Sequence, residues 1–385
     1  MRFTRTDDSL IAEWWFTIDR RLLVSLLMLI GAGLIMSLAA SPAIAVKKGL
    51  PAFHFVERHI VFASVSGIVM LVVSLLGPRH VRRLALGLML LAIGGMIAVL
   101  VVGAEINGAR RWINLFGVSL QPSELAKPGF VVASAWLLAE ARRSGESTAL
   151  IMGVAFYVAM VGLLLAQPDL GQALLVSVVW GALFFLSGQS LQRAFAFGIS
   201  AVGILGVAAF TFDHARQRIV RFVMPSSGET YQMDRALQSF AEGGLLGRGP
   251  GEGTIKTVLP DAHTDFIFAV IAEEFGAVAC LLLVAIYGFV LVRAFARSRT
   301  QPDAFTRLAV MGLSLLIVVQ AAINMGVNVG LLPAKGMTLP FVSAGGSSSL
   351  GTAIAAGLLL ALMRRRSDAA HVKLPHPDNS LMAAR

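Results

Sequence analysis

Ten long apolar stretches constrain this chain more than any other feature of its sequence. A helix needs about 20 mainly apolar residues to cross the hydrocarbon core of a bilayer. The stretches that meet or approach this length are 22–40, 60–77, 84–103, 125–140, 149–166, 170–187, 194–211, 266–292, 306–330 and 340–363. Only 14% of the residues are charged, too few to cover a water-facing surface, since soluble chains carry about 25%. The sequence therefore predicts an all-α, polytopic membrane protein with about ten transmembrane helices and excludes a soluble enzyme.

The basic residues indicate how these helices are oriented. An even number of spans places both termini on one side, and short cytoplasmic loops carry an excess of Lys and Arg. With the termini in the cytoplasm, 19 of the 32 basic residues lie in cytoplasmic segments and 13 outside, of which 6 lie in one long outer loop. We therefore expect a cytoplasmic segment 1–21, a ten-helix membrane domain 22–363 and a disordered cytoplasmic tail 364–385. The long outer loop, 212–264, joins helices seven and eight.

The net charge of +10 is then mainly a consequence of topology, and no nucleic-acid partner is expected. The single cysteine, Cys280, excludes an intramolecular disulfide framework and a cysteine-based metal cluster. The seven His are scattered, so the sequence shows no committed metal site.

Polar residues at the ends of the apolar stretches cluster on the predicted outer side, and each is a functional candidate because burial in a membrane is costly. Glu124 and Lys127 are three residues apart and share one face of a helix. They could form a salt bridge that lets the short fourth helix enter the membrane. Alternatively, Lys127 could bind a phosphate at the mouth of an inner cavity. The two roles are compatible. Trp112 is a candidate substrate platform, although such residues more often belong to the interfacial aromatic belt. Asp169 is expected to cap the sixth helix.

Acidic residues mark the start of the eighth span. Asp265 opens it after His263 and Thr264, and Glu273 and Glu274 follow about two turns deeper. An acid at that depth must pair or face water, so we expect this helix to line a polar cavity and the two glutamates to be paired. A carboxylate at the mouth of such a cavity could act as a general base. The residues alone give equal weight to a catalytic and a structural role for Asp265.

The last outer segment is rich in small residues and includes Ser347. Small residues normally let helices pack closely. The alternative is a nest of backbone amides that binds an anion.

Read together, seven segments resemble the SEDS family of bacterial cell-envelope proteins (FtsW, RodA and SpoVE), and they follow the order found in that family. They are 107–113, 121–127, 167–171, 243–249, 259–268, 273–276 and 339–348. Residues 335–340 resemble the division-type members rather than the elongation type, and 248–253 resemble the alphaproteobacterial version. One departure is Ala344, which stands where the family usually has Tyr.

The resemblance implies a peptidoglycan glycosyltransferase that polymerises lipid II at the outer face of the bacterial inner membrane during septum synthesis. It also implies a class B penicillin-binding protein, an FtsI-type transpeptidase, as partner, with other divisome membrane proteins. In the family, the aspartate that matches Asp265 is taken as the catalytic residue, here a general base. The candidates for contact with the pyrophosphate are Lys127, Arg111, Arg248 and Lys335, with Glu124 holding Lys127 in place. A divalent cation, Mg²⁺ or Mn²⁺, could share the phosphate charge.

Two other functions stay open. A polar cavity lined by acids would also suit a lipid II flippase, and Pro128, Gly330 and Pro340 could mark the broken helices found in carriers. The polar candidate residues cluster on the predicted outer side of the membrane, and the sequence shows no visible inverted repeat. Both observations favour the transferase over the flippase. The third possibility is a non-catalytic scaffold that activates the crosslinking enzyme.

Overall fold

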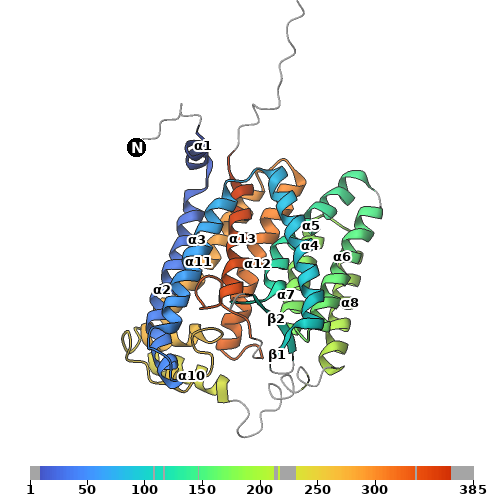
Figure 1. Ribbon diagram of the computed structural model, residues 1–385. Helices are drawn as coiled ribbons and strands as arrows, with labels where there is room; N and C mark the ends of the chain where they lie inside the picture. Colours follow the sequence, from blue (N-terminus) through green and yellow to red (C-terminus); the bar gives the residue numbers. More distant parts are fainter. Residues whose placement is uncertain are drawn as a thin grey trace, which may run out of the picture.

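The computed structural model describes residues 9–106, 109–115, 118–145, 147–211, 216, 231–333 and 336–365, which form a helical bundle (Figure 1). Its elements are α1 (Leu10–Thr17), α2 (Arg20–Lys47), α3 (His54–Ser74), α4 (Pro78–Val102), β1 (Ala104–Ile106), β2 (Ala109–Leu115), β3 (Val118–Leu120), α5 (Pro122–Ser144), α6 (Ser147–Ala166), α7 (Leu170–Leu186), α8 (Leu191–Thr211), α10 (Tyr231–Gly243), η1 (Ile255–Thr257), α11 (Ile267–Ser298), α12 (Ala304–Asn328) and α13 (Gly346–Met363). The all-α class is confirmed, and each predicted span overlaps one helix among α2–α8 and α11–α13.

The outer surface of the bundle suits lipid rather than water. Within the described part of the chain, 7 helices are long and apolar enough to cross a membrane, namely α2, α3, α4, α6, α11, α12 and α13. Large apolar side chains such as Leu91, Val101 and Leu281 are mostly exposed on these helices, more than a water-facing surface tolerates. The chain is a multi-pass membrane protein. The number of crossings and their orientation stay predictions.

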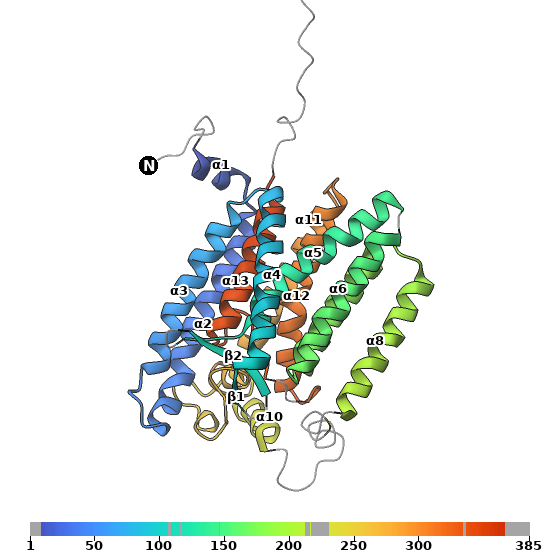
Figure 2. The ribbon, with the colours of Figure 1, turned by 45° about the vertical axis from the view of Figure 1, so that its right-hand side comes forward.

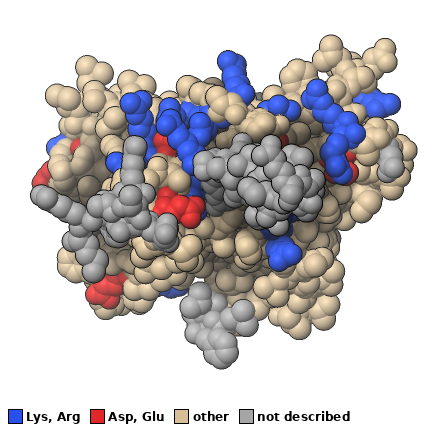
Figure 3. All heavy atoms as spheres, turned by 90° about the horizontal axis from the view of Figure 1, so that it is seen from above, with Lys and Arg blue, Asp and Glu red and all other residues tan. Residues whose placement is uncertain are grey.

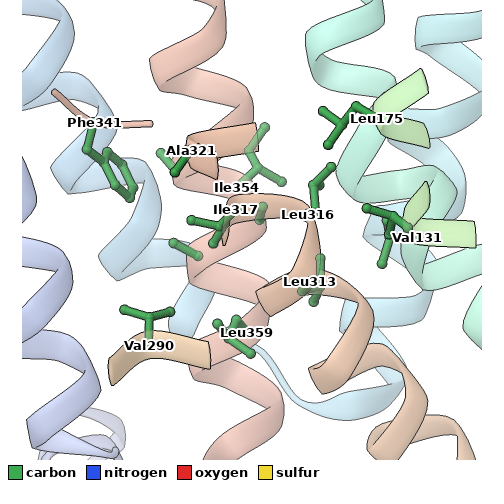
Figure 4. Packing of buried hydrophobic residues seen from close by; sticks show 14 of the residues in the cluster. Val131, Leu175, Val290, Leu313, Leu316, Ile317, Ala321, Phe341, Ile354 and Leu359 are labelled. Atoms are coloured by element: carbon green, nitrogen blue, oxygen red, sulfur yellow. The ribbon is translucent and has the colours of Figure 1, made fainter. Parts of the chain in front are cut away.

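Helices α12 and α13 form the centre of the bundle, and most of their residues are buried (Figures 1 and 2). Helix α3 packs along α13, α4 along α5, and α5 against both central helices, while α8 lies at the edge against α7. In Figure 4, Leu313, Leu316 and Ile317 of α12 lie among apolar side chains of the neighbouring elements. The contact of α13 with α5 is especially close, because a Cβ at Gly351 would overlap the carbonyl oxygen of Glu124.

The face that carries α1 and both ends of the described chain bears many Lys and Arg side chains (Figure 3). One of its cations, Arg364, is buried and ties three elements together. It donates to Glu13 Oε1 of α1 at 3.0 Å, to Thr17 Oγ1 at 2.9 Å and to the carbonyl of Leu75, just after α3, at 3.0 Å. This is the face that the charge distribution predicts to be cytoplasmic.

The opposite face carries elements that the sequence did not indicate. Three short strands pair antiparallel in the order β1-β2-β3. They are too short to produce a recognisable period-2 pattern, so the apolar stretches alone gave no signal for them. The predicted outer loop 212–264 contains α10 and η1, which lie at this end of the bundle (Figure 1).

Two predicted spans differ from the structure in their course. The eighth, predicted as one helix over 266–292, is interrupted at Gly276, whose φ of 76° and ψ of −179° are not helical. That φ favours glycine, and the neighbouring backbone leaves no room for a side chain, because a Cβ there would overlap Leu245 O. The tenth, predicted from residue 340, begins at Gly346, and residues 336–345 are non-helical although Leu339 and Val342 are buried.

Replacing Gly276 with Ala should destabilise the protein, because the new Cβ overlaps Leu245 O and the φ of 76° with ψ of −179°, a backbone region essentially confined to glycine, costs about 1–3 kcal/mol for other residues. The thermal unfolding midpoint of the purified protein in detergent measures this. Gly288→Ala is the matched control, since it lies in the same helix with nothing within 4 Å of its added Cβ. We expect no loss of stability in the control; equal midpoints for the two variants would show that the break at Gly276 is not required.

Candidate functional site

Asp265 lies in a tight turn immediately before α11, and its side chain is partly exposed. The turn begins at Asp261, which has a φ of 53° and whose carbonyl accepts the N–H groups of Thr264 at 3.0 Å and Phe266 at 3.2 Å. Phe266 is the N-cap, and the helix begins at Ile267. The helix thus begins one residue after the start of the predicted span 266–292, and Asp265 belongs to the turn that precedes it.

Two asparagines of α12 hold the backbone of this turn. The side-chain amides of Asn324 and Asn328 donate to the carbonyl oxygen of Asp265 at 2.8 and 2.9 Å. Asn324 also donates to the carbonyl of Met337 at 2.6 Å, and Asn328 Oδ1 accepts the N–H of Ala269 at 3.0 Å. Both asparagines are buried, so their bonds do not compete with bulk water.

The non-helical segment 336–345 forms the other side of the turn. Ser343 Oγ donates to the carbonyl of Thr264 at 2.6 Å, and the N–H of Ala344 donates to the carbonyl of His263 at 3.0 Å. At the other end of the segment, a Cβ on Gly336 would lie 3.6 Å from Asp265 Oδ2. The carboxylate of Asp265 therefore faces this segment.

Glu124 and Lys127 of α5 form the ion pair that their spacing predicts. Glu124 Oε2 lies 2.8 Å from Lys127 Nζ, and the two side chains are only 4% and 3% exposed. Glu124 Oε1 accepts from Gln172 Nε2 at 2.6 Å, and Lys127 donates to Gln320 Oε1 at 2.8 Å. The pair is thus satisfied by side chains of α7 and α12 and lies inside the bundle.

Gln320 connects this ion pair to the segment beside Asp265. Its amide nitrogen lies 3.2 Å from the carbonyl of Thr338 and 3.3 Å from Ser348 Oγ. Thr338 Oγ1 in turn donates to Ser348 Oγ at 2.6 Å. One face of α12 therefore binds the ion pair through Gln320 and the Asp265 turn through Asn324.

The residues around Arg111 form a second polar cluster. Arg111 donates to the carbonyls of Gln167, at 3.0 Å, and Pro168, and pairs with Asp169 at 3.6 Å. Asp169 caps α7 by accepting the N–H of Gln172 at 3.3 Å. Burial raises the pKa of Asp169, and the charge of Arg111 opposes that rise. These bonds attach β2, where Trp112 is partly exposed, to the turn between α6 and α7.

Ser347 has a structural connection of its own. Its hydroxyl donates to the carbonyl of Ser119 at 3.1 Å and accepts the N–H of Gln121 at 3.1 Å. These two bonds attach the start of α13 to the segment that leads into α5.

Glu273 and Glu274 bind the glycine-rich loop that follows α10. Glu273 accepts the N–H groups of Thr254, Ile255 and Lys256 at 2.6, 2.8 and 3.3 Å. Glu274 forms a buried ion pair with Lys256 and accepts the N–H of Gly251 at 3.0 Å. Both carboxylates therefore pair with the loop, and the expected cavity is not needed to explain their burial.

Arg248, on the same loop, pairs with Glu242 and donates to Thr254 Oγ1 at 3.0 Å. Lys335 lies outside the described residues. Among the residues that are described, no three His, Cys, Asp or Glu side chains come together in a way that could hold a metal ion.

His263 is buried near Lys48, a cation that the sequence did not single out. Its ring lies 4.8 Å from that of Phe55, and Lys48 Nζ lies 5.4 Å from the centre of the Phe55 ring. Burial, followed by the charge of Lys48, lowers the pKa of His263, so the imidazole is neutral at pH 7.

The sequence offered signals for some of the residues it missed. Gln320, Asn324 and Asn328 are spaced four residues apart, which places them on one helix face, and three such amides in an apolar span are unusual. Lys256 carried no signal, because only folding brings it to Glu274.

Comparison with known proteins identifies close sequence relatives. The family model for FtsW, RodA and SpoVE, described as "Cell cycle protein", matches residues 20–368. The "Probable peptidoglycan glycosyltransferase FtsW" of Caulobacter vibrioides is 41% identical over 368 residues, covering 95% of this chain and 94% of that protein. The protein of the same name from Geobacter metallireducens is 33% identical and covers 90% of this chain and 96% of its own length.

Solved structures share the fold. One, described as "Structural coordination of polymerization and crosslinking by a peptidoglycan synthase complex", matches with a TM-score of 0.75 and 29% identity over 91% of this chain and 98% of that chain. The rod shape determining protein RodA of Thermus thermophilus matches with a TM-score of 0.68 and 29% identity over 92% of this chain and 99% of its own.

Replacing Lys127 with Met should leave Glu124 as a buried, uncompensated carboxylate and destabilise the protein by about 3–5 kcal/mol. The double variant Glu124→Gln, Lys127→Met removes both charges and should recover most of that loss. Thermal or denaturant unfolding in detergent measures both effects. A single variant as stable as the parent would show that the ion pair does not support the bundle.

Proposed function

We propose that this chain, which belongs to the FtsW/RodA/SpoVE family of cell cycle proteins, is a peptidoglycan glycosyltransferase that polymerises lipid II into glycan strands. Its relatives over nearly the full length bear the name of that enzyme. The observation that carries the proposal is the Asp265 turn, where two buried asparagines bind the backbone carbonyl of Asp265 and its side chain stays partly exposed, next to the start of α11.

The reaction requires a base in this setting. The 4-hydroxyl of one sugar attacks the anomeric carbon of another, and the leaving group is a lipid-linked pyrophosphate. The attacking hydroxyl must lose its proton, whereas the pyrophosphate needs little protonation, so one carboxylate suffices where hydrolases use two. We assign the base to Asp265, whose backbone is held rigidly while its carboxylate is partly exposed.

The lipid tail of the substrate stays in the bilayer, so the reacting groups must meet at the membrane boundary. Asp265 precedes the first turn of α11 and contacts Asn328, the last residue of α12. Helix ends of membrane-spanning segments lie at that boundary. The position therefore suits a headgroup that reaches the carboxylate while its lipid stays in the membrane.

Of the predicted cations that the structure describes, Lys127 is the one whose position favours contact with the pyrophosphate. It shares the polar network of Gln320 with the segment next to Asp265. Arg111 and Arg248, in contrast, are bound to Asp169 and Glu242. Because Lys127 is buried against Glu124 and Gln320, its ammonium must release one of those two side chains to bind a phosphate oxygen.

A divalent cation, Mg²⁺ or Mn²⁺, would supply further charge neutralisation at the pyrophosphate. Such ions need several oxygen ligands, and the described residues form no acidic cluster. Asp265 would contribute one carboxylate to an ion whose other ligands come from the substrate and water.

The partner that we propose is a class B penicillin-binding protein of the FtsI type, acting with other divisome membrane proteins at the division septum. Support comes from the solved complex that coordinates polymerisation with crosslinking and from the relatives that bear the name FtsW. The bacterial inner membrane is the location that this function requires.

The alternative with structural support is lipid II transport. The non-helical segment 336–345 is buried between helices, as the broken helices of carriers are. Its polar groups, however, are bound by Gln320, Asn324 and Ser343 rather than turned toward a passage.

Replacing Asp265 with Ala should nearly abolish glycan-strand formation. The polymerisation rate should fall about 10²–10⁴-fold, because the attacking hydroxyl then lacks its base. The assay uses the purified chain with its crosslinking partner and labelled lipid II, with strands resolved on gels. Lipid II binding should persist. Glu252→Gln, an exposed acid of the outer loop, is the control and should polymerise normally.

Normal polymerisation by the Asp265 variant would refute its assignment as the base. Wild-type protein that moves lipid II across liposomes yet makes no strands would favour transport instead. Wild-type protein that does neither, but stimulates the crosslinking enzyme, would favour the scaffold.

A further inference from the structure

We propose that Asn324 and Asn328 are positioning residues that keep Asp265 out of α11 and thereby aim its carboxylate. The inference rests on the proposed function, since it gives Asp265 the role of base. It concerns two residues that never need to touch the substrate.

The carboxamide of Asn328 occupies the place of a backbone hydrogen bond. In a helix extended to Asp265, the N–H of Ala269 would donate to the Asp265 carbonyl, four residues back. Here Asn328 Oδ1 accepts that N–H at 3.0 Å, and Asn328 Nδ2 donates to that carbonyl at 2.9 Å. One side chain thus bonds both groups, with Phe266 O sharing the N–H at 3.1 Å and Asn324 sharing the carbonyl, and the helix begins at Ile267.

Asn324 fixes the same carbonyl from the next turn of α12. It donates to Asp265 O at 2.8 Å and to Met337 O at 2.6 Å, so one amide joins the turn to the segment that faces the Asp265 carboxylate. A Cβ on Gly336, the residue before Met337, would lie 3.6 Å from Asp265 Oδ2. Asn324 thus fixes the Asp265 turn relative to the segment 336–345, which lies opposite the carboxylate.

Burial makes these bonds expensive to lose and therefore effective constraints. Asn324 and Asn328 are 1% and 0% exposed, and an amide at that depth is costly unless its donors and acceptor are bonded. Close apolar packing of α12 would be served equally well by Leu or Ala. The partner that the two amides share is instead one backbone carbonyl, that of Asp265, while Asn324 also bonds Met337 O and Asn328 also bonds Ala269 N and Asn324 O.

Gln320 extends the same helix face toward the proposed pyrophosphate contact. It accepts from Lys127 at 2.8 Å and donates to Thr338 O, the carbonyl next to Met337, at 3.2 Å. The base and the cation are therefore positioned by one face of one helix. A change at Asn324 or Asn328 should disturb the base and leave the cation in place.

The test compares steady-state polymerisation of labelled lipid II by Asn324→Asp, Asn328→Asp and wild type, each purified with its crosslinking partner acylated by a β-lactam. Aspartate has the size of asparagine but, when ionised, donates to no carbonyl. We expect kcat to fall about 10²-fold, the effect of misplacing a catalytic group by about 1 Å. KM for lipid II should stay within about twofold, because ground-state binding is retained.

Ser314→Ala is the matched control, since Ser314 is buried in α12 and donates only to Met311 O of its own helix. It should keep both kcat and KM. Asn324→Ala, measured beside it, removes the donor without adding an acid and should repeat the kcat loss of Asn324→Asp.

Unchanged kcat in both aspartate variants would overturn the proposal. A rise in KM that matches the fall in kcat/KM would also overturn it, because the two residues would then serve substrate binding. Failure of the aspartate and alanine variants to fold would overturn it too, because the role would then be purely structural. Failure of the proposed function is a separate result: wild type would then make no strands, or Asp265→Ala would make them normally.

Discussion

Every polar group of this protein that lies at membrane depth has to find its partner inside the protein, because lipid offers none. Helices meet this requirement on their own, but the buried backbone of the segment 336–345 and of the adjoining Asp265 turn does not. Side chains of α12 meet it for them: Gln320 and Asn324 bind carbonyls of the segment, and Asn324 and Asn328 bind that of Asp265. The site exists because one polar helix face makes irregular backbone tolerable inside an apolar bundle.

The same requirement accounts for the buried charges. Glu124 and Lys127 neutralise each other and are bonded by Gln172 and Gln320. Glu274 is paired with Lys256. The two ion pairs serve different ends: the first joins α5 to α7 and α12, and the second secures the glycine-rich loop that follows α10.

Several features of the site could be predicted from the sequence, and the reasons are local. The spacing of Glu124 and Lys127 indicates a shared helix face, and the position of Asp169 before an apolar stretch indicates a cap; the structure contains both contacts. The three strands, the partner of Glu274 and the course of residues 340–345 were not predictable. Each depends on contacts between segments distant in the chain, which leave no periodic pattern.

The sequence by itself determined that the chain crosses a membrane as a helical bundle, because too few charges remain to cover a water-facing surface and the apolar stretches have the length that a bilayer requires. It also determined the candidate residues, because polar groups are rare enough in such stretches to be conspicuous. Only the tertiary structure decided where Asp265 would lie. Local sequence favours a helix that begins there, and an amide 63 residues further along the chain replaces the bond that would have closed it. That outcome rests on the free energy of satisfying buried polar groups, which is determined by the packing of α12 against the turn.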